Sequence, residues 1–175
     1  FSNSTLADAV VNLAIGKLSR PLQEALREHA LWLMSDGKEG QRADFAGKDF
    51  TGIDFSNVNL GAARLKGCRF HKASLAKSVL VLADLSGADL TEADLNQANL
   101  AGTDFSGSNL RGARLANANI GAIDIVAKTA EQPQRKRKTN FSGADLSDVD
   151  LARVDLTHAV VAEAKLPEGD LVPAD

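Results

Sequence analysis

The sequence predicts a mainly β solenoid, a column of stacked square coils, from two repeating patterns. Leu, Phe or Ile stands at every fifth position in an unbroken row from Phe45 to Ile125, and a shifted row runs from Phe141 to Leu166. A small residue usually stands two positions before each large one, and Asp or Asn stands one position before it. A period of five fits neither the helical repeat of about 3.6 residues nor the two-residue alternation of a strand.

Each five-residue repeat is expected to form one short side and one corner of a coil. Residues two apart on an extended segment share a face, so the large residue, called the centre below, points inward together with the small residue. The Gly and small polar residues after the centre allow a sharp corner. Four corners close a coil of about twenty residues, and coils stack at roughly 4.8 Å. Equivalent centres then stack, as in Phe50, Phe70, Leu90 and Leu110.

Residues 1–40 lack this period and are expected to form an N-terminal helical hairpin that caps the column. Apolar residues recur at helical spacing over 6–18 and again over 22–33, with Pro21 between the two segments and Gly37 after the second. An uncovered coil leaves an apolar end and unpaired strand edges. We therefore expect the second helix to cover the first coil.

The column is expected to span 41–171 with one interruption. Ile125 and Phe141 are sixteen residues apart rather than five, so eleven residues are inserted, and we place them within 127–138. Pro133 and its polar neighbours predict an exposed loop. The loop is sharply basic because of four consecutive residues, Arg135, Lys136, Arg137 and Lys138.

The pattern Ala-Asp-Leu-x-x, as in Ala83-Asp84-Leu85 and Ala88-Asp89-Leu90, resembles the pentapeptide repeat family. The resemblance covers about residues 43–166. It implies a right-handed quadrilateral parallel β-helix, here of about six coils. Some proteins of this family mimic DNA and act on type II topoisomerases, which protects against quinolones. The stretch 29–44 also resembles the segment that precedes such repeats in some proteobacterial proteins.

We expect a cytoplasmic protein, which the composition supports, and a bacterial source, which the resemblance of 29–44 implies. Charged residues make up 25% of the chain and the net charge is −3, which favours neither disorder nor nucleic-acid binding. A single cysteine excludes an internal disulfide and fits a reducing compartment. We find no apolar run that could span a membrane and no signal peptide, and we expect a monomer or a weak dimer.

No residues of the sequence form a plausible catalytic or metal-binding constellation. His29 lies on the apolar stripe of the second predicted helix, whereas His71 and His158 are expected at the surface, and none has a neighbour at metal-ligand spacing. Cys68 occupies a small inward position, where a buried structural thiol is expected. The Asp series is expected to cap the backbone at the corners rather than to bind calcium. We therefore predict no enzyme activity, no metal and no cofactor.

One of the four faces of the column carries no charge and is a candidate interaction face. Contiguous exposed apolar surface usually marks a partner site or an intramolecular contact. The cover could be the first predicted helix, the 127–138 loop, a second copy of the chain or another protein. The face comprises Asn59, Ala62, Val79, Val81, Leu82, Asn99, Ala101, Asn119 and Ala122.

A second candidate feature is a band of basic residues in one coil, followed by an acidic coil. Pairing of opposite charges between coils would account for it, and binding of an anionic partner is the functional alternative. The band consists of Arg64, Lys66, Arg69, Lys72 and Lys77.

These features favour a non-enzymatic protein-interaction scaffold that uses flat β-helix faces. The first alternative, a DNA-mimic modulator of type II topoisomerase, requires a strongly anionic surface, which a net charge of −3 and a basic coil do not provide. The second alternative is weak nucleic-acid binding through the basic loop, which would be salt-sensitive and non-specific. A protein partner is therefore expected, and a nucleic-acid partner is not.

Overall fold

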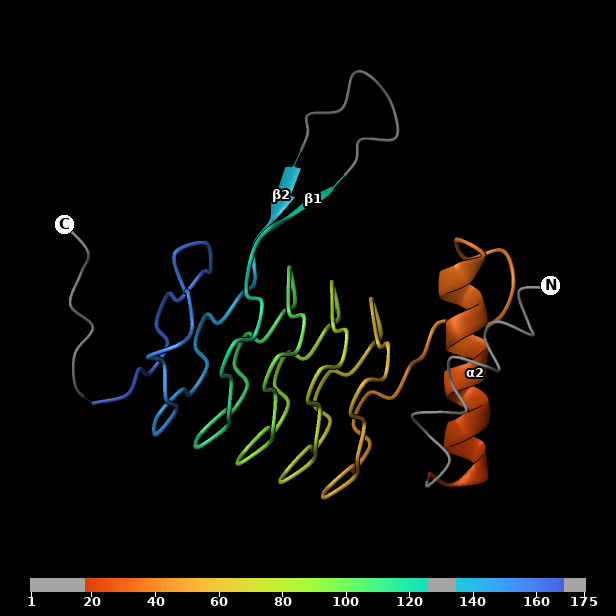
Figure 1. Ribbon diagram of the computed structural model, residues 1–175, viewed down its shortest axis with the longest axis horizontal. Helices are drawn as coiled ribbons and strands as arrows, with labels where there is room; N and C mark the ends of the chain where they lie inside the picture. The colour runs from red at the N-terminus through yellow and green to blue at the C-terminus, as the bar shows by residue number, and fades with distance from the viewer. Residues whose placement is uncertain (1–17, 126–134, 169–175) are drawn as a thin grey trace.

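The computed structural model describes residues 18–125 and 135–168, and all structural statements concern these residues. Helix α2 (Arg20–Met34) stands at one end of a column of stacked coils (Figure 1). Strands β1 (Ile123–Ile125) and β2 (Arg135–Arg137) form an antiparallel hairpin that projects from the side of the column. The first predicted helix lies almost wholly outside the described residues.

Parallel pairing between residues twenty positions apart builds the column. Asp44 pairs with Arg64 and Asp49 with Arg69, and the same offset continues coil by coil to Asn99 and Asn119. The N–H of each centre from Phe45 to Leu110 donates to a carbonyl of the next coil, as Phe50 does to Arg69 at 2.7 Å. The stacked square coil predicted from the five-residue period is confirmed, and so is the right-handed quadrilateral β-helix that the family resemblance implies.

The interior of the column is filled by the centres and their small partners. Every centre from Leu60 to Leu110 has no exposed surface, and Ala83 and Ala93 are equally buried. Aromatic centres stack between coils, with ring centroids 5.3 Å apart for Phe50 and Phe70. Burying one such side chain contributes about 1.5–3 kcal/mol, so the interior provides most of the stabilisation of the column.

The coil after the hairpin resumes at Phe141. Its ring lies parallel to that of Phe105 at 5.0 Å, and Asn140 pairs with Asp104. Phe141 follows Phe105 by thirty-six residues, where twenty would complete a coil. The insertion is therefore sixteen residues long and spans 123–138.

The predicted eleven-residue loop within 127–138 is wrong in both length and position. Ile125 is not a centre: it is 39% exposed and pairs with Arg135 in the hairpin. If Ile125 pointed inward, Ile123 would have to fill the small position beside it. Thr139 fills that position instead, fully buried, with its Oγ1 donating to the Leu100 carbonyl at 2.8 Å.

The Asp and Asn residues before the centres cap the corners of the coils. The Oδ1 atom of Asp49 accepts the N–H of Thr51 at 2.9 Å, and Asp84 accepts the N–H of Ser86 at 3.0 Å. Bonds of this kind, to the backbone two residues on, stabilise tight turns. The prediction that these carboxylates serve the backbone is confirmed for the corners that show this bond.

Helix α2 covers the open end of the first coil. It starts after Ser19, with Pro21 in its first turn, and buries Leu26 and His29 against the column. The Nδ1 atom of His29 accepts the N–H of Ala43 at 3.1 Å, which joins helix to column. Burial lowers the pKa of His29 to about 4, and the Gly61 backbone opposes this in part.

This joint predicts a loss of stability in acid. Because the pKa of His29 is about 4 in the folded chain against 6.5 when unperturbed, only the unfolded state binds a proton between these values. The free energy of unfolding of wild type should therefore fall by about 3 kcal/mol as the pH drops from 7.5 to 4. The single tryptophan, Trp32, stacks on His29 at 5.8 Å, so its fluorescence in urea titrations reports this change.

The matched control is His29→Gln, which retains a hydrogen-bond acceptor but cannot titrate. The variant should show a weaker pH dependence than wild type across this range. If the free energy of unfolding depends on pH equally in wild type and in His29→Gln, the buried imidazole does not control docking of the helix.

Candidate interaction surfaces

The predicted uncharged face consists of two different surfaces in the structure. Asn59, Val79, Asn99 and Asn119 form a flat ladder, and the Nδ2 of Asn119 donates to the Oδ1 of Asn99 at 3.0 Å. The residues after each centre form a row of corners instead, called the corner row below. The corner row comprises Gly61, Ala62, Val81, Leu82, Ala101, Gly102, Gly121 and Ala122.

Helix α2 and the segment after it cover one end of the corner row. A Cβ placed on Gly61 would lie 3.7 Å from Cδ2 of Leu33. The Nε of Arg42 donates to the carbonyl of Ala62, and its guanidinium lies 5.9 Å from the ring of Trp32. This end of the row is therefore occupied by the chain itself.

The root of the hairpin covers the other end of the corner row. A Cβ on Gly102 would lie 2.8 Å from Cγ2 of Ile123 and 3.0 Å from Cδ2 of Leu82, so only glycine fits. The Nε of Arg137 donates to the Gly102 carbonyl at 3.1 Å, and Thr139 accepts the Gly102 N–H. The hairpin is thus attached to the column at Gly102.

These contacts leave a narrow apolar surface in the middle of the predicted face. Ala101 is only 7% exposed, and Val79, Val81 and Leu82 are half-buried. Leu82 has a φ of 60°, which is strained for a leucine, and its side chain packs over Gly102 beside Ile123. Leu82 therefore supports the hairpin, and its role toward a partner remains a prediction, as does that of its neighbours.

Most of the basic band pairs with acidic residues of adjacent coils. Arg64 contacts Asp44 at 3.3 Å, Arg69 contacts Asp49 at 3.0 Å, and Lys72 contacts Glu92 at 3.7 Å. The side chains are exposed, so each pair contributes about 0–1 kcal/mol. The Ala46 N–H and Arg64 lower the pKa of Asp44, in line with this pairing. Lys66 and Lys77 have no ion pair with the part of the chain that the structure describes.

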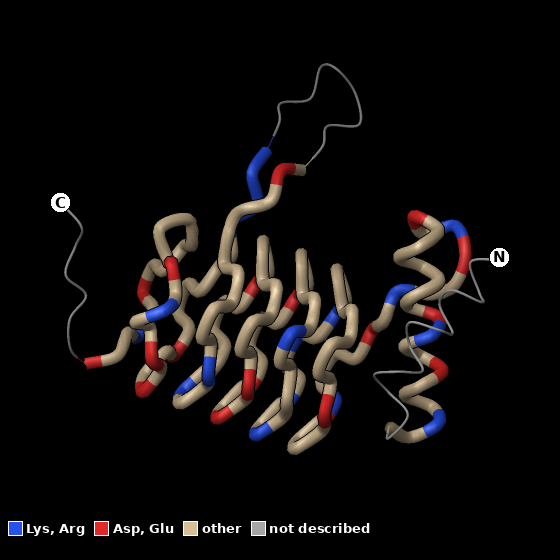
Figure 2. Tube along the Cα trace, in the orientation of Figure 1, with Lys and Arg blue, Asp and Glu red and all other residues tan. Residues whose placement is uncertain are grey.

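The hairpin concentrates positive charge that the rest of the protein neutralises only weakly. Figure 2 shows β2 as a block of basic residues that stands away from the column. Arg135, Lys136, Arg137 and Lys138 are all exposed. Within 18–125 and 135–168 their carboxylate contacts are Asp124 with Lys136 and Asp104 with Arg137, both at 4.0 Å. The predicted exposure of these residues is confirmed, but 135–137 form a strand rather than a loop.

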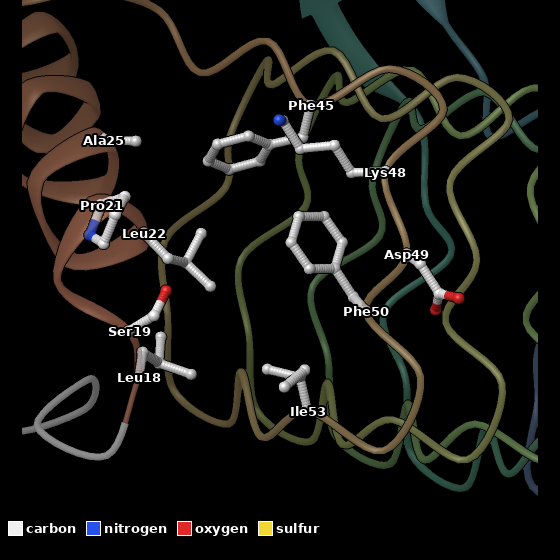
Figure 3. A pocket seen from close by; sticks show the side chains of 10 residues that line it. All are labelled: Leu18, Ser19, Pro21, Leu22, Ala25, Phe45, Lys48, Asp49, Phe50 and Ile53. Atoms are coloured by element: carbon white, nitrogen blue, oxygen red, sulfur yellow. The ribbon is translucent and has the colours of Figure 1, made fainter.

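An apolar pocket of about 390 Å³ lies between α2 and the first coil (Figure 3). Leu22, Phe45, Phe50 and Ile53 contribute to its lining, and Lys48 extends from the coil toward α2. Sequence reasoning missed this pocket. The signal was Lys48 itself, which stands where later coils have a small buried residue.

Within 18–125 and 135–168, the cysteine, the histidines and the carboxylates do not gather at this pocket or at another single site. Cys68 is buried, its Sγ donates to the Phe45 carbonyl at 2.9 Å, and burial raises the pKa of the thiol. His29 is buried at the helix joint, whereas His158 is exposed. Among the residues with described positions, no three His, Cys, Asp or Glu side chains are placed to hold a metal ion.

Comparison with known families identifies the repeat. The family "Pentapeptide repeats" matches the chain in eight copies over residues 41–71, 53–91, 83–121 and 137–171. These ranges cover more than half of the sequence and skip most of the hairpin insertion. The chain belongs to the pentapeptide repeat family. None of the curated proteins matches it.

Several solved structures are similar to this chain. A pentapeptide repeat protein of the Arabidopsis thaliana thylakoid lumen is 30% identical, with 62% of this chain and 68% of that chain covered and a TM-score of 0.33. Rfr23 from the cyanobacterium Cyanothece 51142 is 21% identical, with 71% and 88% covered and a TM-score of 0.32. QnrB1, a plasmid-mediated fluoroquinolone resistance protein, is 20% identical, with 76% and 70% covered and a TM-score of 0.36.

None of the helices in the described ranges has the length and apolar character needed to cross a membrane.

The contact between the hairpin and Gly102 predicts that two glycine substitutions will differ in their effect on stability. Gly87 and Gly102 both have a positive φ, but a Cβ on Gly87 would meet nothing within 4 Å. Gly87→Ala should lower the free energy of unfolding by about 1 kcal/mol through backbone strain alone. Gly102→Ala should cost clearly more, because its methyl group also displaces Ile123. Urea unfolding measures both losses.

Hydrogen exchange then locates the damage. Amides of β1 and β2 should exchange faster in Gly102→Ala than in wild type and remain unchanged in Gly87→Ala. Equal losses of stability and equal exchange in the two variants would contradict the contact between hairpin and corner row.

Proposed function

We propose that this protein is a non-enzymatic protein-interaction scaffold that presents the β1–β2 hairpin to a partner protein. One observation carries the proposal: four consecutive exposed cations stand on an element that projects from the column and is fixed at its root. A rigid support and an unneutralised recognition surface together suit binding of another macromolecule.

The charges on the surface of the column support the proposal that the column is the rigid support and the hairpin the binding element. Its carboxylates bond to the corners, and several arginines of one coil pair with acids of the next, as Arg114 does with Asp94 at 2.7 Å. Charges used in this way stabilise the stack and are less available to a partner. The described hairpin residues have no comparable short ion pair.

DNA mimicry fits the same surface less well. A mimic of DNA needs a continuous run of negative charge. The aspartate rows are interrupted by Arg64 and Arg69 in one coil and by Arg114 in a later coil. The scaffold proposal therefore accounts for more of the charge pattern than topoisomerase modulation does.

Capture with cross-linking in cells of the source organism tests the proposal. The hairpin variant carries Arg135→Glu, Lys136→Glu and Lys138→Glu, and keeps Arg137 because it holds the Gly102 carbonyl. The control variant carries Arg20→Glu, Lys38→Glu and Arg153→Glu, which changes the net charge equally at exposed cations outside the hairpin and the basic band.

The same protein should be cross-linked by wild type and by the control variant, and at least tenfold less by the hairpin variant. Equal recovery of every cross-linked protein by the two variants would overturn the proposal. Recovery of nucleic acid instead of protein, lost only in the hairpin variant, would replace it with nucleic-acid binding.

A further inference from the structure

We propose that strand β2 is a docking edge for an extended acidic segment, which would add to the hairpin as a third strand. The inference rests on the proposed scaffold function and names the chemistry of the partner. It follows from three properties of the hairpin: an open backbone edge, the sign of its charge, and its attachment to a rigid support.

The open edge follows from the pairing of the hairpin. The sheet has only two strands, in register from Ile123 with Arg137 to Ile125 with Arg135. Within residues 18–125 and 135–168, no backbone hydrogen bond joins β2 to any segment other than β1. An edge of this kind is a template for an extended peptide, whose backbone groups complete the pairing.

The charge of β2 selects which peptide can use this edge. Side chains alternate along a strand, so Arg135 and Arg137 share one face and Lys136 lies on the other. Acidic residues at alternate positions of an added strand can therefore face Arg135 and Arg137 together. Each opposite-charge pair across strands contributes about 0.2–1 kcal/mol, and like charges are destabilising.

The same charge excludes a second copy of the chain at this edge. Pairing of β2 with β2 would set three cations against three cations, which opposes association. Charged edges protect proteins from indiscriminate strand pairing, and that protection is selective: it rejects neutral and basic strands but admits acidic ones.

The attachment of the hairpin makes such an edge usable. Arg137 and Ile123 are held at Gly102 of the column, and Leu82 packs beside them. A partner strand would therefore meet an edge whose root is already ordered, which reduces the entropy lost on binding. A backbone edge also favours a peptide over nucleic acid, whose phosphates would use only the charges.

Fluorescence anisotropy with the full chain tests this inference. The probe is a labelled eight-residue peptide of alternating Glu and Thr. The first control is the same peptide N-methylated at every residue, which keeps the charge but removes the backbone N–H donors of both edges. The second is a labelled oligothymidine. The hairpin and control variants defined above are titrated in parallel.

The Glu/Thr peptide should bind wild type and the control variant, and at least tenfold more weakly to the hairpin variant. N-methylation should weaken its binding at least tenfold. The inference fails if the peptide does not bind, if the N-methylated peptide binds equally well, or if the oligothymidine binds more tightly.

Failure of the inference and failure of the proposed function are distinguishable. If the peptide fails but the cross-linked partner still depends on the hairpin, strand addition is wrong and the scaffold function stands. If no cross-linked partner depends on the hairpin, the scaffold proposal itself is wrong.

Discussion

Each side of a coil holds one large centre beside a smaller inward residue, and this restriction determines how the rest of the chain is placed. The first coil, next to α2, departs from it, because Ile53 stands at such a position and packs against the core. Leu85 and Ala83 fill one side completely, and neither is exposed. A second large side chain would cost about 1–3 kcal/mol in overpacking. The alternation of large and small inward residues therefore sets the register of every coil and decides which segments must leave the column.

The hairpin is a consequence of that restriction. In the preceding coils the row of small positions next to Ile120 holds Ala63, Ala83 and Thr103, all fully buried, and Ile123 would be the largest side chain in that row. The chain instead leaves the column after Ala122 and returns at Thr139, which is fully buried at that position. Because the corners on this side carry Gly and Ala, the root of the hairpin can pack directly on them at Gly102. The hairpin and its contact with Gly102 therefore lie on one edge of the column, next to the strained Leu82.

The five-residue period was sufficient to predict the coil, the stacking of its centres and the turn-capping role of the aspartates, because each depends on local spacing. The limits of the insertion were missed because Ile125 satisfies the five-residue period. The sign of an earlier start was Ile123, which is larger than Ala83 and Thr103 at the equivalent positions of the preceding coils. That signal was present in the sequence. The pairing of β1 with β2 was not, because strands of three residues have no recognisable pattern, and the Gly102 contact joins residues distant in sequence.

Two deletions test the central claim, that interior volume rather than the row of large residues sets the register. Removing 123–138 brings Ala122 next to Thr139 and restores five-residue spacing from Ile120 to Phe141. Removing 128–138 restores that spacing from Ile125 instead, but leaves Ile123 at a small position. Urea unfolding should show the first variant within about 1 kcal/mol of wild type and the second less stable by about 1–3 kcal/mol. A second variant as stable as the first would contradict the claim.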